Sequence, residues 1–202
     1  MTHIDHSEKV FAMRIFLTFL TLIIGLQSFC KADDIRDFQL EGMSIGDSLL
    51  DYFSKKEIEK NKIFEKEQGN NKEVSRYYIT KNVGNYEWIA ASFKTNDKKY
   101  LIIEISGFLF LPFEECLKKR DKIDLEMKKM FSNSERQESG TVQHFIDKNS
   151  LTNNIYYWTS KSSNDVIAFS CYDWSKESGY RDQLRVEVYS DEYHKWLGTL
   201  EK

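Results

Sequence analysis

The spacing of hydrophobic positions predicts a helix near the start of the folded part of the chain. Hydrophobic residues recur at helical spacing from Ile45 through Leu49 to residues 52–53. Ser44 precedes this pattern and an aspartate follows three positions later, a capping-box spacing that predicts a helix beginning at Ser44. A second such box begins at Ser54, so we expect a break there and a short charged helix after it.

Beyond a polar loop over residues 65–73, the hydrophobic period changes from 3.6 to two, which is typical of strands. Turn-forming residues at 82–85 and 95–98 divide this region. We therefore expect an antiparallel meander of three strands, over residues 74–81, 86–94 and 100–111.

A further helix is predicted to begin at Pro112, because proline lacks the N–H that the first turn of a helix leaves unpaired. Its hydrophobic positions fall on one side, and carboxylates and lysines spaced four apart fall on the other. Ser190 stands before a final helix with Tyr193 and Trp196 on its hydrophobic side. Between these two helices we expect four more strands, over residues 141–147, 155–160, 166–172 and 183–189.

These elements follow the order α-βββ-α-ββββ-α, and neither a repeat nor a low-complexity tract divides them. Hairpin-connected strands form antiparallel sheets, and amphipathic helices pack on a sheet with their hydrophobic side. We therefore expect one α+β domain over residues 33–202, with an antiparallel sheet of about seven strands and the helices packed on one face.

The first 32 residues have the composition of a secretory signal peptide. Residues 15–26 are apolar except for two threonines and a glycine, a length that suits a signal-peptide core and is too short to span a membrane. Arg14 supplies the positive charge before this stretch, and Met13 is the more natural start of the chain. Cys30 and Ala32 are the small residues before a cut, so we expect cleavage after Ala32. An uncleaved membrane anchor is the alternative.

Cleavage leaves two cysteines, Cys116 and Cys171, in a protein that we expect in the periplasm or outside the cell. Oxidising compartments favour disulfides, so we expect the two thiols to be joined. Cys116 lies on the hydrophobic side of the middle helix and Cys171 on the inward side of a strand, so the bond would join helix to sheet. Two buried free thiols are the alternative.

The composition is that of a folded domain, with 41% hydrophobic and 30% charged residues. The 29 Lys and Arg against 32 Asp and Glu leave a net charge of −3, which argues against a strongly basic nucleic-acid binder. One proline and nine glycines exclude collagen-like, Pro-rich and Gly-rich chains.

Residues 41–54 have the sequence EGMSIGDSLLDYFS, and two later segments accompany it, residues 115–120 (ECLKKR) and 170–174 (SCYDW). Together these segments resemble a family of small exported proteins from marine bacteria. The resemblance covers most of residues 35–200 and implies export. The family is uncharacterised, so the resemblance implies no activity, cofactor or partner.

Motifs that carry chemistry are sparse. The chain after Ala32 has two histidines, His144 and His194, and no HxxxH or CxxC spacing of the kind that binds zinc. It contains no phosphate-binding glycine loop and no GxSxG nucleophile turn. We therefore expect no metal, no cofactor and no catalytic residue, while a site assembled from residues distant in sequence stays open.

Aromatic residues, at 14% of the chain, provide the candidate binding surface. Because strand side chains alternate, one face of the sheet can form the core while the other presents its rings to solvent. The candidates for such a face are Tyr156, Trp158, Tyr172 and Trp174. The alternative is that a helix or a chain end covers this face.

Two functions remain open. The first is a non-catalytic exported module that binds an envelope protein, glycan or peptide through the aromatic face, with no transmembrane segment after signal cleavage. The second is a hydrolase of envelope or extracellular polymers. The missing motifs favour the first, and a cleft holding His144 or His194 beside a carboxylate and a hydroxyl would favour the second.

Overall fold

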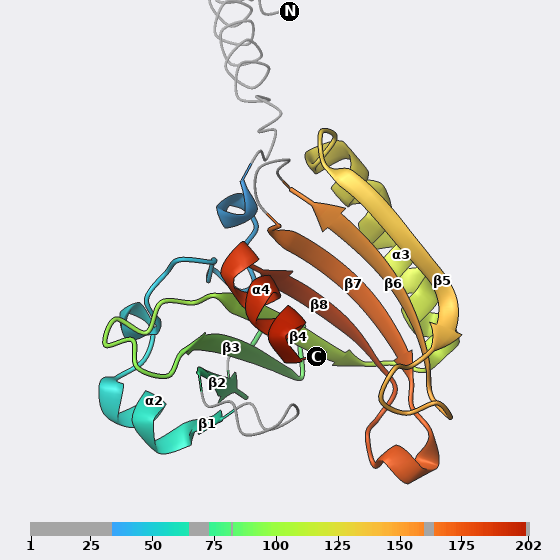
Figure 1. Ribbon diagram of the computed structural model, residues 1–202. Helices are drawn as coiled ribbons and strands as arrows, with labels where there is room; N and C mark the ends of the chain where they lie inside the picture. The colour runs from blue at the N-terminus through green and yellow to red at the C-terminus, as the bar shows by residue number, and fades with distance from the viewer. Residues whose placement is uncertain (1–33, 65–72, 82, 160–163, 201–202) are drawn as a thin grey trace, which may run out of the picture. The chain divides into compact units, whose positions relative to one another are not determined.

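Eight strands form one antiparallel sheet in the computed structural model, which describes residues 34–64, 73–81, 83–159 and 164–200 (Figure 1). Their spatial order is β1-β2-β3-β4-β8-β7-β6-β5. The strands are β1 (Lys62–Phe64), β2 (Val74–Ile79), β3 (Trp88–Lys94), β4 (Glu104–Phe110), β5 (Glu135–Gln143), β6 (Leu151–Trp158), β7 (Val166–Asp173) and β8 (Gln183–Tyr189). The α-helices of this part of the chain are α2 (Lys55–Asn61), α3 (Phe113–Met130) and α4 (Asp191–Leu200), and its 3₁₀ turns are η1 (Ile35–Asp37), η2 (Leu49–Asp51) and η3 (Lys176–Ser178).

The predicted α+β class and antiparallel sheet are confirmed, and the sheet has eight strands where about seven were predicted. The missed strand is β1, which pairs with residues 75–77 of β2. A strand of three residues is too short to show an alternating pattern in the sequence. The strands β2 to β4 and β5 to β8 form two meanders, which meet where β4 pairs with β8.

The predicted helix beginning at Ser44 is wrong, although its capping contact is present. The N–H of Ser44 donates to Oδ2 of Asp47 at 2.9 Å, but Gly46 adopts a left-handed φ of 91°, which a right-handed helix cannot include. The N–H of Gly46 donates to the carbonyl of Ile102, so this segment pairs with the stretch before β4. The second predicted box does cap a helix, since the N–H of Glu57 in α2 donates to Oγ of Ser54.

Strand β5 begins at Glu135, earlier than the predicted position 141, and ends at Gln143. It is an edge strand with nearly every residue exposed, so its sequence shows no hydrophobic alternation. Gly140, with a φ of 64°, lies at a β-bulge in this strand. Residues 144–147, which we predicted as strand, belong to the connection to β6.

Helices cover both faces of the sheet, so the prediction that the helices pack on one face is wrong. In Figure 1, α3 lies behind the sheet and α4 in front of it. Tyr193 and Trp196 of α4 pack on Val74 and Ile103, a hydrophobic cluster separate from the main core. Because strand side chains alternate, Val74 points away from the face on which Tyr77 joins the main core. We call the two surfaces the α3 face and the α4 face.

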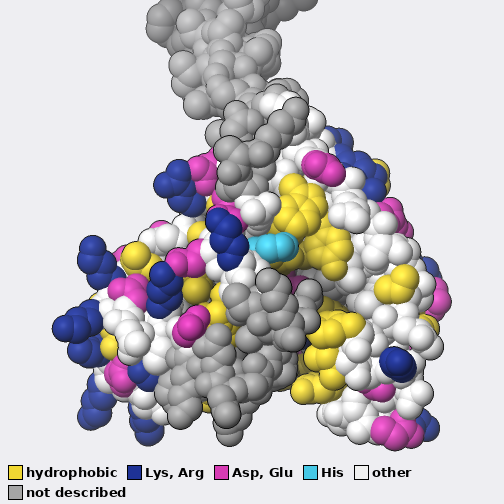
Figure 2. All heavy atoms as spheres, in the orientation of Figure 1, with side chains coloured by type: hydrophobic (Ala, Val, Ile, Leu, Met, Phe, Trp, Pro, Cys, Tyr) yellow, Lys and Arg dark blue, Asp and Glu magenta, His cyan; other side chains and the backbone are white. Residues whose placement is uncertain are grey.

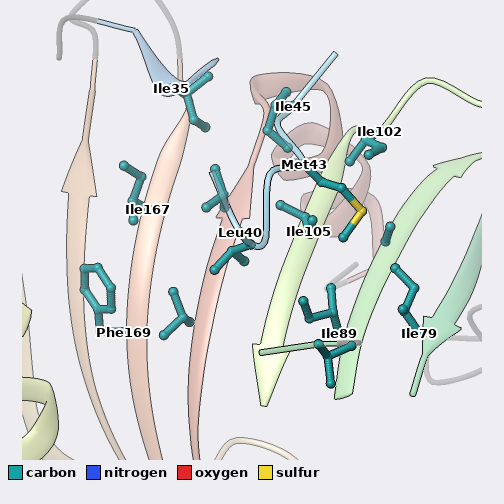
Figure 3. Close-up of a cluster of buried hydrophobic side chains, with 14 of the residues drawn as sticks. Ile35, Leu40, Met43, Ile45, Ile79, Ile89, Ile102, Ile105, Ile167 and Phe169 are labelled. Carbon is teal, nitrogen blue, oxygen red and sulfur yellow. The ribbon is translucent and has the colours of Figure 1, made fainter. Parts of the chain in front are cut away.

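The main core lies on the α3 face (Figure 3). Ile105 and Ile167 of the central strands are fully buried there, under Leu40, Met43 and Ile45 of the N-terminal segment. Burying such a side chain stabilises a protein by about 1.5–3 kcal/mol. This part of the sheet is therefore covered by an irregular N-terminal segment, which includes residues that the sequence predicts to be helical.

The described residues include no helix that is both long and apolar enough to cross a membrane. The predicted signal peptide, its cleavage after Ala32 and the alternative anchor at residues 15–26 lie outside the described residues and stay predictions.

The predicted disulfide is confirmed. Cys116 and Cys171 are bonded, with Cα atoms 5.8 Å apart and both residues fully buried. The bond joins α3 to β7 across the main core and links positions 55 residues apart in the sequence.

We expect the double variant Cys116→Ala/Cys171→Ala to have a free energy of unfolding lower by about 4 kcal/mol, because the bridge restricts the unfolded chain. Urea unfolding followed by circular dichroism measures the difference. The parent protein in dithiothreitol is the control and should unfold at the same urea concentration as the variant. A variant as stable as the oxidised parent would contradict the prediction.

Asp124 joins α3 to the edge of the sheet through charged and hydroxyl partners. Its carboxylate accepts hydrogen bonds from Nε of Arg136 at 2.8 Å, Nζ of Lys128 at 2.7 Å and the hydroxyl of Tyr157 at 2.5 Å. Burial by itself raises the pKa of Asp124, but these bonds to the charged form outweigh it and lower the pKa to about 2.

Asp124→Asn should lower the free energy of unfolding by about 2 kcal/mol at pH 7. Because the folded pKa lies below the ordinary value of 3.8, this stabilisation is present above about pH 4 and is lost as the pH falls toward 2. Urea unfolding at pH 7, 4 and 3 should therefore show a shrinking gap between parent and variant. Glu126→Gln, at an exposed position of the same helix, is the control. A gap that does not change with pH would show that the charge is not responsible.

Candidate functional site

The register of the sheet places short side chains across the middle of the α4 face. Paired positions on successive strands form one line: Tyr78, Ala90, Ser106, Glu187, Ala168 and Tyr156. The alanines and the serine rise less far above the sheet than the tyrosines at the two ends. Ala90, Ser106 and Ala168 are fully buried, and Glu187 is the member of this line that borders the cavity described next.

A cavity of about 500 Å³ lies on this face, bordered by α4, by β8 and by the loops after β5 and β7. We call it the α4-face cavity. Figure 2 shows hydrophobic side chains gathered over β6 to β8 on this face, with charged side chains around them. Its volume is within the range of about 300–1,000 Å³ that is usual for small-molecule sites.

One wall of the cavity consists of stacked aromatic side chains. The rings of Tyr172 and Trp174 are parallel within 4°, with centroids 5.4 Å apart. Tyr180 packs on Trp174 at 4.8 Å, and the guanidinium of Arg185 lies 5.0 Å from the ring of Tyr172. Arg185 pairs with Ser170, so it lies on the other side of Tyr172 from Trp174 along the strand. The two rings therefore pack on each other and on side chains from β8 and from the loop that follows β7.

A tight turn after β5 continues this wall, because the ring of His144 packs on Trp174 with centroids 4.6 Å apart. Nδ1 of His144 accepts hydrogen bonds from the backbone N–H groups of Ile146 at 3.3 Å and Asp147 at 3.4 Å. Oδ2 of Asp147 accepts hydrogen bonds from the hydroxyls of Ser150 and Ser175, both at 2.6 Å, and these bonds lower the pKa of Asp147. The carboxyl group of Asp147 is therefore held in its charged form.

A buried ion pair connects three strands to α4 beside the cavity. Nη2 of Arg76 lies 3.1 Å from Oε2 of Glu104, and the hydroxyl of Ser92 donates to the same oxygen at 2.5 Å. Nη2 of Arg76 also donates to the hydroxyl of Tyr193 at 3.1 Å. Only 1% of Glu104 is exposed, so the pair depends on its partners and not on water.

A second ion pair lines the cavity itself. Nη1 of Arg185 donates to Oε1 of Glu187 at 3.3 Å, and the guanidinium lies between the rings of Phe108, at 4.9 Å, and Tyr172. Within the described residues, Nε of Arg185 and Nε1 of Trp174 are buried N–H groups with no hydrogen-bond partner. An unpaired buried N–H costs about 1–3 kcal/mol.

The four aromatic residues predicted from the sequence share the α4 face and divide into two pairs. Tyr172 and Trp174 line the cavity. Tyr156 ends the line of short side chains, and Trp158 packs on His194 of α4 at 5.3 Å, so this pair belongs to the surroundings of the cavity. All four are half-buried, and Tyr172 and Trp174 are covered partly by each other and by His144.

The candidates predicted from the sequence do not include Arg185 and Glu187, the ion pair that lines the cavity. Their signal is present, because residues 184, 186 and 188 are the inward positions of β8 and the residues between them must point outward. Arg76 and Glu104 gave a weaker signal, as single charges within strands that are otherwise mostly apolar.

No group of three or more His, Cys, Asp and Glu residues that could hold a metal ion occurs among the described residues. Comparison with models of protein families, with curated proteins and with solved structures found no match. The resemblance of residues 41–54 to a marine bacterial family therefore stays a prediction, and the geometry of the cavity carries the functional argument.

Glu104→Gln should lower the free energy of unfolding by about 3 kcal/mol, because it removes the charge that neutralises buried Arg76. The double variant Arg76→Met/Glu104→Leu should lose less, since neither charge then remains. Urea unfolding of both variants measures the comparison. A single variant that is no less stable than the double variant would contradict this account of the ion pair.

Proposed function

We propose that this protein is a non-catalytic exported binding module of the cell envelope, in the periplasm or outside the cell, and that its ligand occupies the α4-face cavity. The observation that carries the proposal is the pair Tyr172 and Trp174, two stacked rings on a rigid strand end beside a cavity of about 500 Å³. Aromatic side chains in such a place give a ligand a large contact area at a low entropic cost.

The charges around the cavity support a ligand without a strong charge of its own. Among the described residues, the two arginines that line it are each paired with a glutamate, Arg76 with Glu104 and Arg185 with Glu187, so neither adds an excess positive charge. A nucleic acid would need an excess of positive charge along its path. A cavity lined in this way favours an uncharged ligand over nucleic acid.

A hydrolase is the second candidate, because His144 and Asp147 both line the cavity, with Ser178 in the same wall. A general acid needs a proton to give, and the lowered pKa of Asp147 keeps that carboxyl ionised. Nδ1 of His144 is directed at backbone N–H groups of its own turn. These contacts hold a turn in place, so we favour binding over hydrolysis.

The full chain, expressed with export and purified, should co-sediment with the insoluble envelope fraction of a Gram-negative bacterium. Trp174→Ala should lower the bound fraction at least tenfold, because it removes one of the two stacked rings of the cavity wall. Trp158→Ala is the matched control, since it makes the same change on the same face outside the cavity wall, and it should bind within twofold of the parent. Circular dichroism confirms that both variants are folded.

Equal binding by the parent and by a folded Trp174→Ala variant would overturn the proposal. His144→Gln separates the second candidate from the first. The parent should release no soluble reducing sugar or amino groups from the same envelope fraction. A release that the parent performs and His144→Gln abolishes would replace the binding module with a hydrolase.

A further inference from the structure

We infer that the ligand of the α4-face cavity is an uncharged saccharide, recognised by the Arg185–Glu187 pair beside the Tyr172–Trp174 wall. This inference rests on the proposed function and names the chemical class of the ligand. It comes from the hydrogen-bonding capacity that the cavity leaves unused.

Nε of Arg185 and Nε1 of Trp174 belong to residues that line the cavity, and both are buried donors that lack an acceptor within the described residues. Buried N–H groups are nearly always paired in folded proteins, and unpaired ones are costly. A ligand that offers an acceptor oxygen to either group, after a small movement of that side chain toward the cavity, would remove this cost, whereas an acyl chain would leave it in place.

Glu187 adds an acceptor next to these donors and restricts the ligand further. Its Oε1 accepts from Nη1 of Arg185 at 3.3 Å, and a carboxylate can accept additional hydrogen bonds. A ligand hydroxyl can accept from Arg185 and donate to Glu187 at the same time. A ligand carboxylate or phosphate would meet Glu187 as a like charge, and an amine would meet Arg185 in the same way. The pair therefore selects an uncharged group that both donates and accepts.

The aromatic wall selects the rest of the ligand. Tyr172 and Trp174 are rigid apolar surfaces that gain from contact with C–H groups. A sugar ring carries hydroxyls around its rim and C–H groups on its faces, so it satisfies both requirements. An extended peptide is bound most directly at a sheet edge, where backbone groups are available, and this cavity lies on a sheet face.

Isothermal titration calorimetry with chitotetraose and cellotetraose tests the inference on the purified full chain. At least one of these uncharged tetrasaccharides should bind, and Arg185→Met should weaken that binding at least tenfold. Arg181→Met is the matched control, because Arg181 packs on Phe110 at 3.9 Å in a separate arginine–ring contact, and it should bind within twofold of the parent. Glu187→Gln, which keeps the size of the side chain, should also weaken binding. If Arg185→Met does not fold, this second variant tests whether the Arg185–Glu187 pair recognises the saccharide.

The other outcomes overturn one proposal or the other. If neither tetrasaccharide binds the folded parent, the saccharide inference is wrong. Tetragalacturonate, tetra-alanine and decanoate are the comparison probes. If the parent binds one of them and Trp174→Ala does not, the cavity is still the binding site, but its ligand is not an uncharged saccharide. Envelope binding that persists in Trp174→Ala would overturn the proposed function itself.

Discussion

The pairing of β4 with β8 is the constraint on which the rest of the structure depends. These strands pair from Glu104 opposite Tyr189 to Phe110 opposite Gln183, and they join two meanders that each form from local hairpins. The partners are far apart in the sequence, so the chain between them must be ordered before their contacts contribute. The Cys116–Cys171 bond joins α3 to β7, the strand that pairs with β8 on its other side.

This pairing also determines the chemistry of the α4 face. It puts Ser106 beside Glu187, within the line of paired positions that crosses the face. It also puts Phe108 beside Arg185, so the guanidinium of Arg185 packs on the ring of Phe108. A shift of one residue between β4 and β8 would turn Leu184 and Val186 toward the cavity. The same shift would bury the charged side chains of Arg185 and Glu187 in the main core. The hydrophobic core on one face and the candidate site on the other are therefore consequences of a single register.

Local patterns in the sequence predict the elements that local physics controls. The alternation of β8 and the lone pair of cysteines gave the strand over residues 183–189 and the disulfide. The helix expected at Ser44 failed because a distant segment, around Ile102, takes up the backbone groups that a helix would pair. The aromatic candidates share a face because alternation is local, but their division between the cavity and its surroundings depends on pairing and on α4, which no local pattern reveals.

The bulged strand β5 has a consequence for how the protein behaves at high concentration. A sheet edge presents unpaired backbone groups to which strands of other molecules can add. Charged side chains such as Glu135, Arg136 and Glu138, together with the bulge at Gly140, make such an addition costly in desolvation and in shape. The polar residues of β5 leave no hydrophobic alternation by which the strand could be predicted. The same residues protect the edge of the sheet from aggregation.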